Sequence, residues 1–329
     1  MNRALEIADF LGEHGWEDAV PTSLPADWAS RHYARLNHPD GRIAILMDAP
    51  PEQKTPEYVM IARLLTRIGL HAPEIYAAAP LQGLVLMEDL GARNIGHLLD
   101  QGEAAAPYLK RCITVLAHLH QNWVAPAPHE AGPLPRYTTT LFAEQAGLFI
   151  DYYAPSILNR DITPDEKAAF DAAWHSALRP ISQLPQNLML RDFMPDNVMD
   201  LSDRLPSEAV TSIGLVDFQD AGVGPVAYDI ASLCEIVRRA GGDQLLPQMQ
   251  AHYISLVKPD YEAEDLRRAC VILSAQRHMR IIGIITRLAQ NGRPEKQAYL
   301  PRIRAQMQVW LRDPALAAIT KWLEKVPCL

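Results

Sequence analysis

Two short apolar stretches of the sequence each end in acidic residues, and this pair constrains the chain more than any other feature. Residues 187–190 (NLML) lead into RDFMPDN over residues 191–197, and residues 212–216 (SIGLV) lead into DFQD over residues 217–220. A single Asp after a strand usually caps a turn. Here Asn197 follows Asp192 after five residues, and the second stretch delivers Asp217. Because the three occur together and in order, the strand ends are expected to carry a functional site.

Phosphoryl transfer requires a set of this kind. One carboxylate accepts or orients the attacking hydroxyl, while an Asn oxygen and a second carboxylate hold Mg²⁺ against the nucleotide phosphates. Hard oxygen ligands of this type suit Mg²⁺. The pattern therefore favours a phosphotransferase over the other enzyme classes, and the chain contains no Gly-Lys-Ser/Thr sequence that would indicate a Walker P-loop.

The first ninety residues have a mixed α/β pattern. Residues 2–14 have helical periodicity, and turn-forming residues 37–41 separate two strands of a predicted hairpin, Arg31–Leu36 and Arg42–Met47. A helix is predicted to begin at Thr55, with Thr55 as its N-cap and Pro56 at its first position. A short apolar strand, Leu84–Met87, follows.

The remainder of the chain is mostly helical in pattern. Thr163 and Glu166 form a capping box that begins a helix reaching to about Leu184. Further helices are predicted over residues 104–121, 226–240 and 263–290. The chain is therefore predicted to be an α+β protein with two lobes, a small β-rich N-lobe over residues 1–90 and a mainly helical C-lobe over residues 91–329. The cleft between the lobes is the natural ligand site.

Composition excludes several partners. Lys and Arg number 31 against 39 Asp and Glu, so the net charge of −8 argues against nucleic acid, whose binding needs a basic surface. No apolar stretch approaches the ~20 residues that span a bilayer. Glu6 and Asp9 lie where a secretory signal would be apolar, and they argue against such a signal. The four cysteines lack metal-ligand or redox spacing. These observations predict a cytoplasmic protein with free thiols and with neither a nucleic-acid nor a membrane partner. A monomer is a separate expectation that composition does not test.

Four segments together make the chain similar to a known superfamily. They are residues 191–197, the block DFQDA with GP and YDIASL over residues 217–233, AILMDAPP over residues 44–51, and residues 276–292 with QRH at their start. On these segments the chain resembles the aminoglycoside/choline phosphotransferase superfamily, which has the protein-kinase-like fold. Within it, the chain looks most similar to bacterial anomeric amino-sugar kinases, which phosphorylate N-acetylmuramate and N-acetylglucosamine for cell-wall recycling.

The resemblance implies roles for particular residues and makes ATP and Mg²⁺ the expected cofactors. Asp192 is the implied catalytic base, with Asn197 and Asp217 as the Mg²⁺ ligands. Asp229 is implied to tether amides of the catalytic loop, although an acidic residue there also suits the N-terminus of a helix. Residues 88–91 correspond to the hinge, where Glu88 and Leu90 meet the adenine.

The region corresponding to the third strand departs from the superfamily. It usually carries a Lys that binds the nucleotide phosphates, whereas here it reads Ile45-Leu46-Met47-Asp48, with Met47 as an expected nucleotide contact. Arg31 and Lys54 are candidates for the missing positive charge, and Ser30 and Arg31 are candidate phosphate contacts. For Arg31 and Lys54 the alternative is a solvated surface charge.

The acceptor is predicted to be a small-molecule sugar or alcohol. Basic residues outnumber acidic ones in residues 230–329, which favours a neutral or acidic sugar over a polycationic one. Arg277 is a candidate contact for the carboxylate of N-acetylmuramate, beside the alternative of a solvated basic stripe, and Asp220 is a second candidate substrate contact. Two other readings stay open, a kinase for an aminoglycoside or choline-type alcohol and a nucleotide-binding pseudokinase.

Overall fold

The structure is a computed structural model that describes residues 3–24, 31–50, 53–124, 134–234, 239 and 242–329. Ser30, a predicted phosphate contact, lies outside these residues. The chain forms two compact units that are not continuous in sequence. Unit 1 consists of residues 1–122 and 195–221, and unit 2 consists of residues 123–194 and 222–329. The predicted lobe boundary at residues 88–91 stays a prediction, and each unit is described below by itself.

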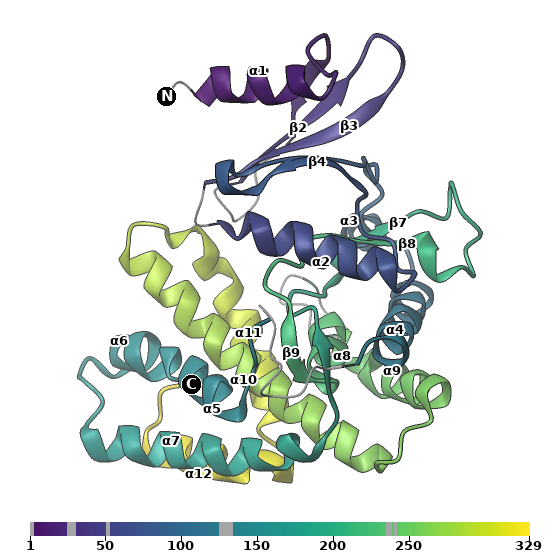
Figure 1. The fold of residues 1–329 in the computed structure, drawn as a ribbon. Coiled ribbons are helices and arrows are strands. Elements are labelled where there is room, and N and C mark those ends of the chain that lie inside the picture. The colour runs from purple at the N-terminus through teal and green to yellow at the C-terminus, as the bar shows by residue number, and fades with distance from the viewer. Residues whose placement is uncertain (1–2, 25–30, 51–52, 125–133, 235–238, 240–241) are drawn as a thin grey trace. The chain divides into compact units, whose positions relative to one another are not determined.

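Unit 1 contains a five-stranded antiparallel sheet with the order β1-β2-β3-β5-β4. Its strands β2, β3 and β4 are labelled in Figure 1. Its strands are β1 (Val20–Ser23), β2 (His32–Asn37), β3 (Ile43–Asp48), β4 (Ile75–Ala79) and β5 (Leu84–Met87). The predicted hairpin is confirmed, since β2 pairs with β3 in a register that places His32 opposite Asp48. Helix α1 (Arg3–Glu13) packs through Phe10 onto one face of the sheet, where Leu36 and Leu46 are buried.

Helix α2 (Thr55–Arg67) begins differently from the prediction. Thr55 is already helical and fully buried, so it is not the N-cap, and its hydroxyl has no hydrogen-bond partner in the described part of the chain. The cap position belongs to Lys54, whose φ of 56° is left-handed and whose side chain makes no capping bond. The apolar face of the helix turns Thr55 inward, so its hydroxyl cannot cap the helix. Gly69 follows the helix with φ of 83°, as a terminating glycine does.

Residues 195–221 of unit 1 contact two helices from its earlier segment, α3 and α4. Strand β7 pairs antiparallel with β8, so that Val198 lies opposite Leu215. The carboxylate of Asp200 at the end of β7 is 1 % exposed and is 2.8 Å from both Arg93 and Arg111. These elements are α3 (Ile95–Asp100), α4 (Ala105–Asn122), β7 (Val198–Asp200), β8 (Ile213–Leu215) and the 3-10 turns Pro80–Gln82, Pro195–Asn197 and Val210–Ser212.

Unit 2 is largely helical and holds a two-stranded antiparallel sheet, β6 (Gln186–Met189) with β9 (Gly222–Pro225). Helix α10 (Ala263–Gln290) spans the predicted range and is mostly buried. The other helices are α5 (Thr139–Ala146), α6 (Ala154–Leu158), α7 (Pro164–Leu178), α8 (Ala227–Cys234), α9 (Gly242–Val257), α11 (Leu300–Trp310) and α12 (Ala317–Lys325). Shorter turns are the π-helix Phe149–Tyr153 and the 3-10 turns Arg179–Gln183, Pro294–Tyr299 and Pro314–Leu316.

Several predictions for unit 2 can be compared directly. The capping box of Thr163 and Glu166 is confirmed. Helix α7 ends at Leu178 instead of about Leu184, and a 3-10 turn that contains Pro180 continues the chain, because proline disrupts α-helical hydrogen bonding. All four cysteines are free, as expected, and the structure shows that they are also buried. Among the described residues, no helix is both long enough and apolar enough to cross a membrane.

Candidate functional site

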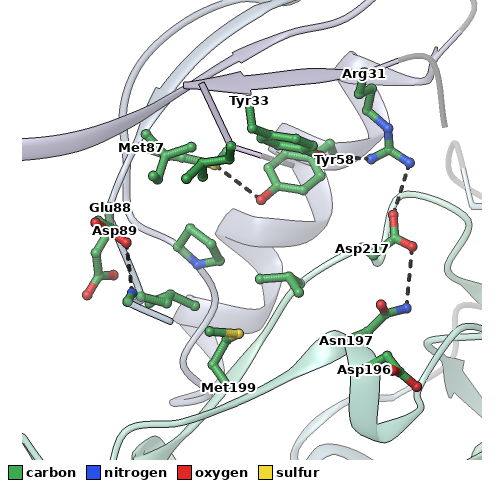
Figure 2. Close-up of a pocket in the computed structure, with 16 residues that line it drawn as sticks. Arg31, Tyr33, Tyr58, Met87, Glu88, Asp89, Asp196, Asn197, Met199 and Asp217 are labelled. Atoms are coloured by element: carbon green, nitrogen blue, oxygen red, sulfur yellow. Dashed lines mark hydrogen bonds and ion pairs between the residues drawn. The ribbon is translucent and has the colours of Figure 1, made fainter. Parts of the chain in front are cut away.

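A pocket of about 300 Å³ lies within unit 1, between the sheet and the segments that flank β7 and β8 (Figure 2). Residues from β2, β3 and β5 form one side, and Asp196, Asn197 and Met199 with Val216 and Asp217 form another. The lining residues are Leu24, Arg31, Tyr33, Ile45, Tyr58, Pro73, Met87, Glu88, Asp89, Leu90, Gly91, Asp196, Asn197, Met199, Val216 and Asp217. The pocket therefore combines the predicted hinge with both predicted metal ligands.

The hinge end of the pocket has fixed side chains and available backbone groups. The carboxylate of Glu88 is 3.1 Å from Nε2 of His71, and this contact raises the pKa of His71. Asp89 accepts from Arg35 and from the N–H of Gly91, and its carbonyl accepts from Arg204. Within the described residues, no hydrogen bond engages the carbonyl of Glu88 or the N–H of Leu90. These two groups suit the donor and acceptor edge of a purine.

An aromatic wall joins the hinge end to the segment after β8. The ring of Tyr58 stacks on Phe218 with centroids 4.8 Å apart and planes 18° apart. Its hydroxyl donates to Sδ of Met87 at 3.2 Å. Figure 2 shows Tyr58 and Tyr33 together on the sheet side of the pocket. This wall supplies the apolar surface that an aromatic ring needs for stacking.

Asn197 and Asp217 lie side by side at the other end of the pocket. Asn197 Nδ2 is 3.3 Å from Asp217 Oδ2, and the N–H of Val216 donates to the carbonyl of Asn197 at 3.2 Å. Asp217 has φ of 60°, an unusual backbone conformation for a residue other than glycine that occurs often at functional sites. Mg²⁺ is commonly bound by one or two protein oxygens plus phosphate oxygens. The pair fits this requirement when the side-chain amide of Asn197 turns its oxygen toward the metal. A flip of the amide exchanges the positions of its oxygen and nitrogen.

Arg31 reaches the same carboxylate from the opposite side. Its Nη2 is 2.9 Å from Asp217 Oδ1, and its Nη1 donates to Gln219 Oε1 at 2.8 Å. Gln219 Nε2 in turn donates to Asp217 Oδ1 at 3.0 Å, which closes a triangle of three side chains. Burial acts to lower the pKa of Arg31, but Asp217 and Tyr33 outweigh it, so the pKa is raised and the guanidinium stays charged.

Three other predicted contact residues do not line the pocket. Met47 is on the same face of β3 as Ile45, but it is fully buried and Ile45 lines the pocket in its place. Lys54 is 2.5 Å from Asp220, and neither lines the pocket. The predicted contact between Met47 and the nucleotide therefore lacks support from this geometry.

The loop after β6, which the resemblance implies to be the catalytic loop, belongs to unit 2 as far as Met194. The carboxylate of Asp229 on α8 accepts from the N–H of Leu190 at 2.6 Å and of Arg191 at 2.9 Å, the tether that the resemblance implies. Arg191 has φ of 70°, and its guanidinium lies 4.5 Å from the ring centroid of Tyr137. The N–H of Asp192 donates to the carbonyl of Leu190 at 2.9 Å. The loop is thus held through its backbone.

Asp229 is 1 % exposed, and burial raises its pKa to about 7. The two backbone donors and Arg277 lower this pKa, whereas Asp192 raises it. Arg277 is only 4 % exposed, so it is not part of a solvated stripe, and its guanidinium lies 6.0 Å from the ring centroid of Tyr228. Its predicted contact with a substrate carboxylate stays a prediction.

The sequence prediction missed some residues that form the site. Tyr33 and Tyr58 line the pocket, yet neither was distinguished from ordinary apolar positions in a strand and a helix. Gln219 stood inside the DFQD motif without an assigned role. Tyr33 lies two residues after Arg31 in the predicted strand Arg31–Leu36, so strand alternation could have identified it.

Comparison with known proteins identifies the family. Residues 21–267 match the model of the Phosphotransferase enzyme family. An N-acetylmuramate/N-acetylglucosamine kinase of Pseudomonas aeruginosa is 29 % identical over 97 % of this chain and 92 % of its own. Among solved structures, a choline/ethanolamine kinase family protein of Mesorhizobium loti covers 96 % of this chain and 97 % of its own, with a TM-score of 0.65 and 15 % identity.

A second solved structure shares the fold with a nucleotide analogue bound. The complex of an amicoumacin kinase with AMP-PNP and Ca²⁺ covers 96 % of this chain and 97 % of its own, with a TM-score of 0.58 and 15 % identity. Both structural matches indicate the protein-kinase-like fold that the sequence predicts. Since the family model covers most of the sequence, the chain belongs to the Phosphotransferase enzyme family and is a kinase.

Proposed function

We propose that the chain is an ATP- and Mg²⁺-dependent kinase that phosphorylates the anomeric hydroxyl of N-acetylmuramate or N-acetylglucosamine, and that it acts as a cytoplasmic monomer. The observation that carries the nucleotide part is the pocket in which open hinge groups and the pair Asn197 and Asp217 line one cavity. The similarity to the amino-sugar kinase of Pseudomonas aeruginosa along nearly the whole chain supports the acceptor class.

In this proposal, the residues have separate tasks. Glu88 and Leu90 bind the purine through the carbonyl of the first and the N–H of the second, while Asn197 and Asp217 hold Mg²⁺. When bound, Mg²⁺ neutralises charge on the transferring phosphoryl group. Asp192, five residues before Asn197 on the same loop, orients the sugar hydroxyl. Because the transition state of phosphoryl transfer is loose, this orientation matters more than strong proton abstraction.

The test is an acceptor screen that measures ADP release with and without Mg²⁺. We expect N-acetylmuramate or N-acetylglucosamine to stimulate Mg²⁺-dependent turnover, and ³¹P NMR of the product to show a sugar 1-phosphate. Stimulation by kanamycin or choline alone would identify a different acceptor class. Nucleotide binding without turnover on any acceptor would support the pseudokinase reading, for which the missing strand lysine is the specific motive.

A further inference from the structure

The nucleotide pocket has an unusual charge balance. Its lining holds four acidic side chains, Glu88, Asp89, Asp196 and Asp217, and one Lys or Arg side chain, Arg31, among the described residues. Strand β3 (Ile43–Asp48) contains no lysine. A nucleoside triphosphate carries several negative charges, and kinases neutralise them with a basic side chain as well as metal ions. The pocket therefore needs a cation in addition to the metal.

Arg31 has the burial of a residue with a fixed task. It is 6 % exposed, whereas surface arginines seldom give up their hydration without a compensating contact. Gln219, 188 positions away in sequence, is 5 % exposed and accepts from its Nη1. A buried polar residue from a distant segment therefore helps to fix this guanidinium, which indicates that its position matters.

The contacts of Arg31 within the described residues leave one N–H donor of its guanidinium group without a partner. Nη1 faces Gln219 and, at 3.4 Å, the hydroxyl of Tyr33, while Nη2 faces Asp217. The buried Nε has no hydrogen-bond partner in the described part of the chain. A guanidinium presents five N–H donors in a planar fork that matches the oxygens of a phosphate. An unpartnered buried donor beside the predicted metal ligands is a group for which a phosphate oxygen is the natural acceptor.

The triangle is also compatible with metal binding. Arg31 and Gln219 contact Oδ1 of Asp217, whereas Asn197 lies against Oδ2. The two oxygens of one carboxylate are thus divided between the arginine and the amide of the predicted metal pair. A neutral Gln suits this position because it links the cation to the carboxylate without adding another negative charge. We propose that Arg31 binds the nucleotide phosphates in place of the strand lysine, and that Gln219 is the positioning residue that holds its guanidinium.

Lys54 is the rival candidate, and its surroundings differ. Its ammonium is 2.5 Å from Asp220, and its side chain is 48 % exposed. It lies outside the lining of the pocket. An exposed ion pair of this kind contributes little energy and is easily rearranged. The two cations can therefore be separated by experiment.

The inference rests on the proposed nucleotide-dependent function, so the test measures binding without any acceptor. Isothermal titration would compare ATP, ADP and adenosine for the wild type, Arg31→Met, Arg31→Lys and Gln219→Met, each with and without Mg²⁺. Loss of a charge-assisted fork predicts that Arg31→Met weakens ATP binding by about 10- to 100-fold while adenosine binding changes by less than about 2-fold. Arg31→Lys should restore part of the ATP affinity, and Gln219→Met should give an intermediate loss.

Two matched variants serve as controls. Lys54→Met removes the rival cation, and Arg42→Gln removes an exposed arginine paired with Asp40 in the hairpin loop. Both should bind ATP as the wild type does. The proposal is overturned if Arg31→Met leaves ATP affinity intact, if it weakens adenosine equally, or if Lys54→Met produces the selective loss. Wild-type ATP binding without turnover on any sugar would instead contradict the proposed function while leaving this inference standing.

Discussion

The segment after β8 in unit 1 and the loop after β6 in unit 2 are held in position by different kinds of contact. Each must present a carboxylate just beyond a short strand, and each contains a non-glycine residue in the left-handed region, Asp217 with φ of 60° and Arg191 with φ of 70°. In unit 2 the backbone is held by Asp229, which is 1 % exposed. In unit 1 side chains hold the carboxylate, and Asp217 keeps 39 % of its side chain exposed.

The difference in burial suits the two carboxylates to different roles, one that fixes the backbone and one that binds a ligand. A buried carboxylate that accepts two backbone N–H groups orders a loop strongly, but taking its charge out of water has a cost, visible in its raised pKa. A partly exposed carboxylate such as Asp217, paired with Arg31, stays in contact with solvent and can accept a cation without a large desolvation cost. Asp229 is therefore suited to structure, and Asp217 is suited to ligand binding.

The largest effect is expected at Asp192, the residue that orients the sugar hydroxyl in the proposed function and lies on the loop after β6 in unit 2. Asp192→Asn keeps the shape of the side chain but removes the charge that orients the hydroxyl, so kcat should fall by about 10²- to 10⁴-fold. Nucleotide affinity should be retained, because its predicted ligands lie on unit 1. Steady-state kinetics with nucleotide titration would check this. Full activity in the variant would remove Asp192 from the mechanism.

Replacing Asp229 tests whether the backbone tether matters for catalysis. Asp229→Asn offers only one acceptor oxygen, so either Leu190 or Arg191 loses its partner, and an unmade buried hydrogen bond costs about 1–3 kcal/mol. We expect kcat to fall by about 10-fold or more, with nucleotide affinity unchanged. Asp217→Asn is the matched comparison and should weaken Mg²⁺-nucleotide binding instead. If both variants lost nucleotide binding alike, the division of tasks would be wrong.

The raised pKa of Asp229 also predicts opposite pH trends for activity and stability. The groups that face its carboxyl are the N–H donors of Leu190 and Arg191, the Asp192 carboxylate and the Arg277 guanidinium. Because the folded-state pKa of about 7 lies above the ordinary value of 3.8, Asp229 stabilises the fold most at low pH. This contribution is lost progressively as the pH rises between those values, because the unfolded chain has then released a proton that the folded protein keeps. Activity should instead rise through pH 7, as the carboxylate that accepts the loop amides becomes charged.

Chemical denaturation and kcat profiles of wild type and Asp229→Asn from pH 5 to 8 would measure both trends. The difference in unfolding free energy between the two proteins should favour the wild type more at pH 5 than at pH 8. The variant should lack the rise of kcat near pH 7. Parallel profiles for both proteins would assign the acid limb to another group.

The parts of the fold encoded by local pattern were predictable. Strand β5 and helix α10 have the predicted bounds. An unbroken apolar run predicts the first, and a long segment with helical periodicity predicts the second. Strand β9, with the sequence GVGP, was missed, because its residues have low strand propensity and its pairing with β6 supplies the reason for its conformation.

The site was predictable where a motif carries it and not where distant segments combine. Asn197, Asp217 and the Asp229 tether followed from short motifs and the resemblance that they carry. Arg31 could be named as a candidate, but no local pattern links it to Gln219, which lies 188 positions away. Met47 was expected at the nucleotide because the corresponding strand was recognised, but strand periodicity alone does not say which residue on the inward face reaches the cavity.

Glycines in the two supporting strand pairs give the smallest and most structural test of the comparison. A Cβ on Gly222 of β9 would collide with the carbonyl oxygen of Pro135 and would lie 2.7 Å from the ring of Tyr137. A Cβ on Gly214 of β8 would lie 2.8 Å from the Cδ1 atom of Leu90, the far end of a flexible side chain. Overpacking against backbone is harder to relieve than overpacking against a rotatable group.

Gly222→Ala should therefore lower the free energy of unfolding by about 1–3 kcal/mol, and Gly214→Ala by less than about 1 kcal/mol. Because β9 pairs with the strand that leads into the catalytic loop, Gly222→Ala should also lower kcat. Gly214→Ala should act through Leu90 on the nucleotide KM. Urea unfolding with steady-state kinetics would measure these effects. If Gly214→Ala were more destabilising than Gly222→Ala, the loop held through its backbone would tolerate displacement better than the segment held by side chains. That result would contradict the distinction drawn between Asp229 and Asp217.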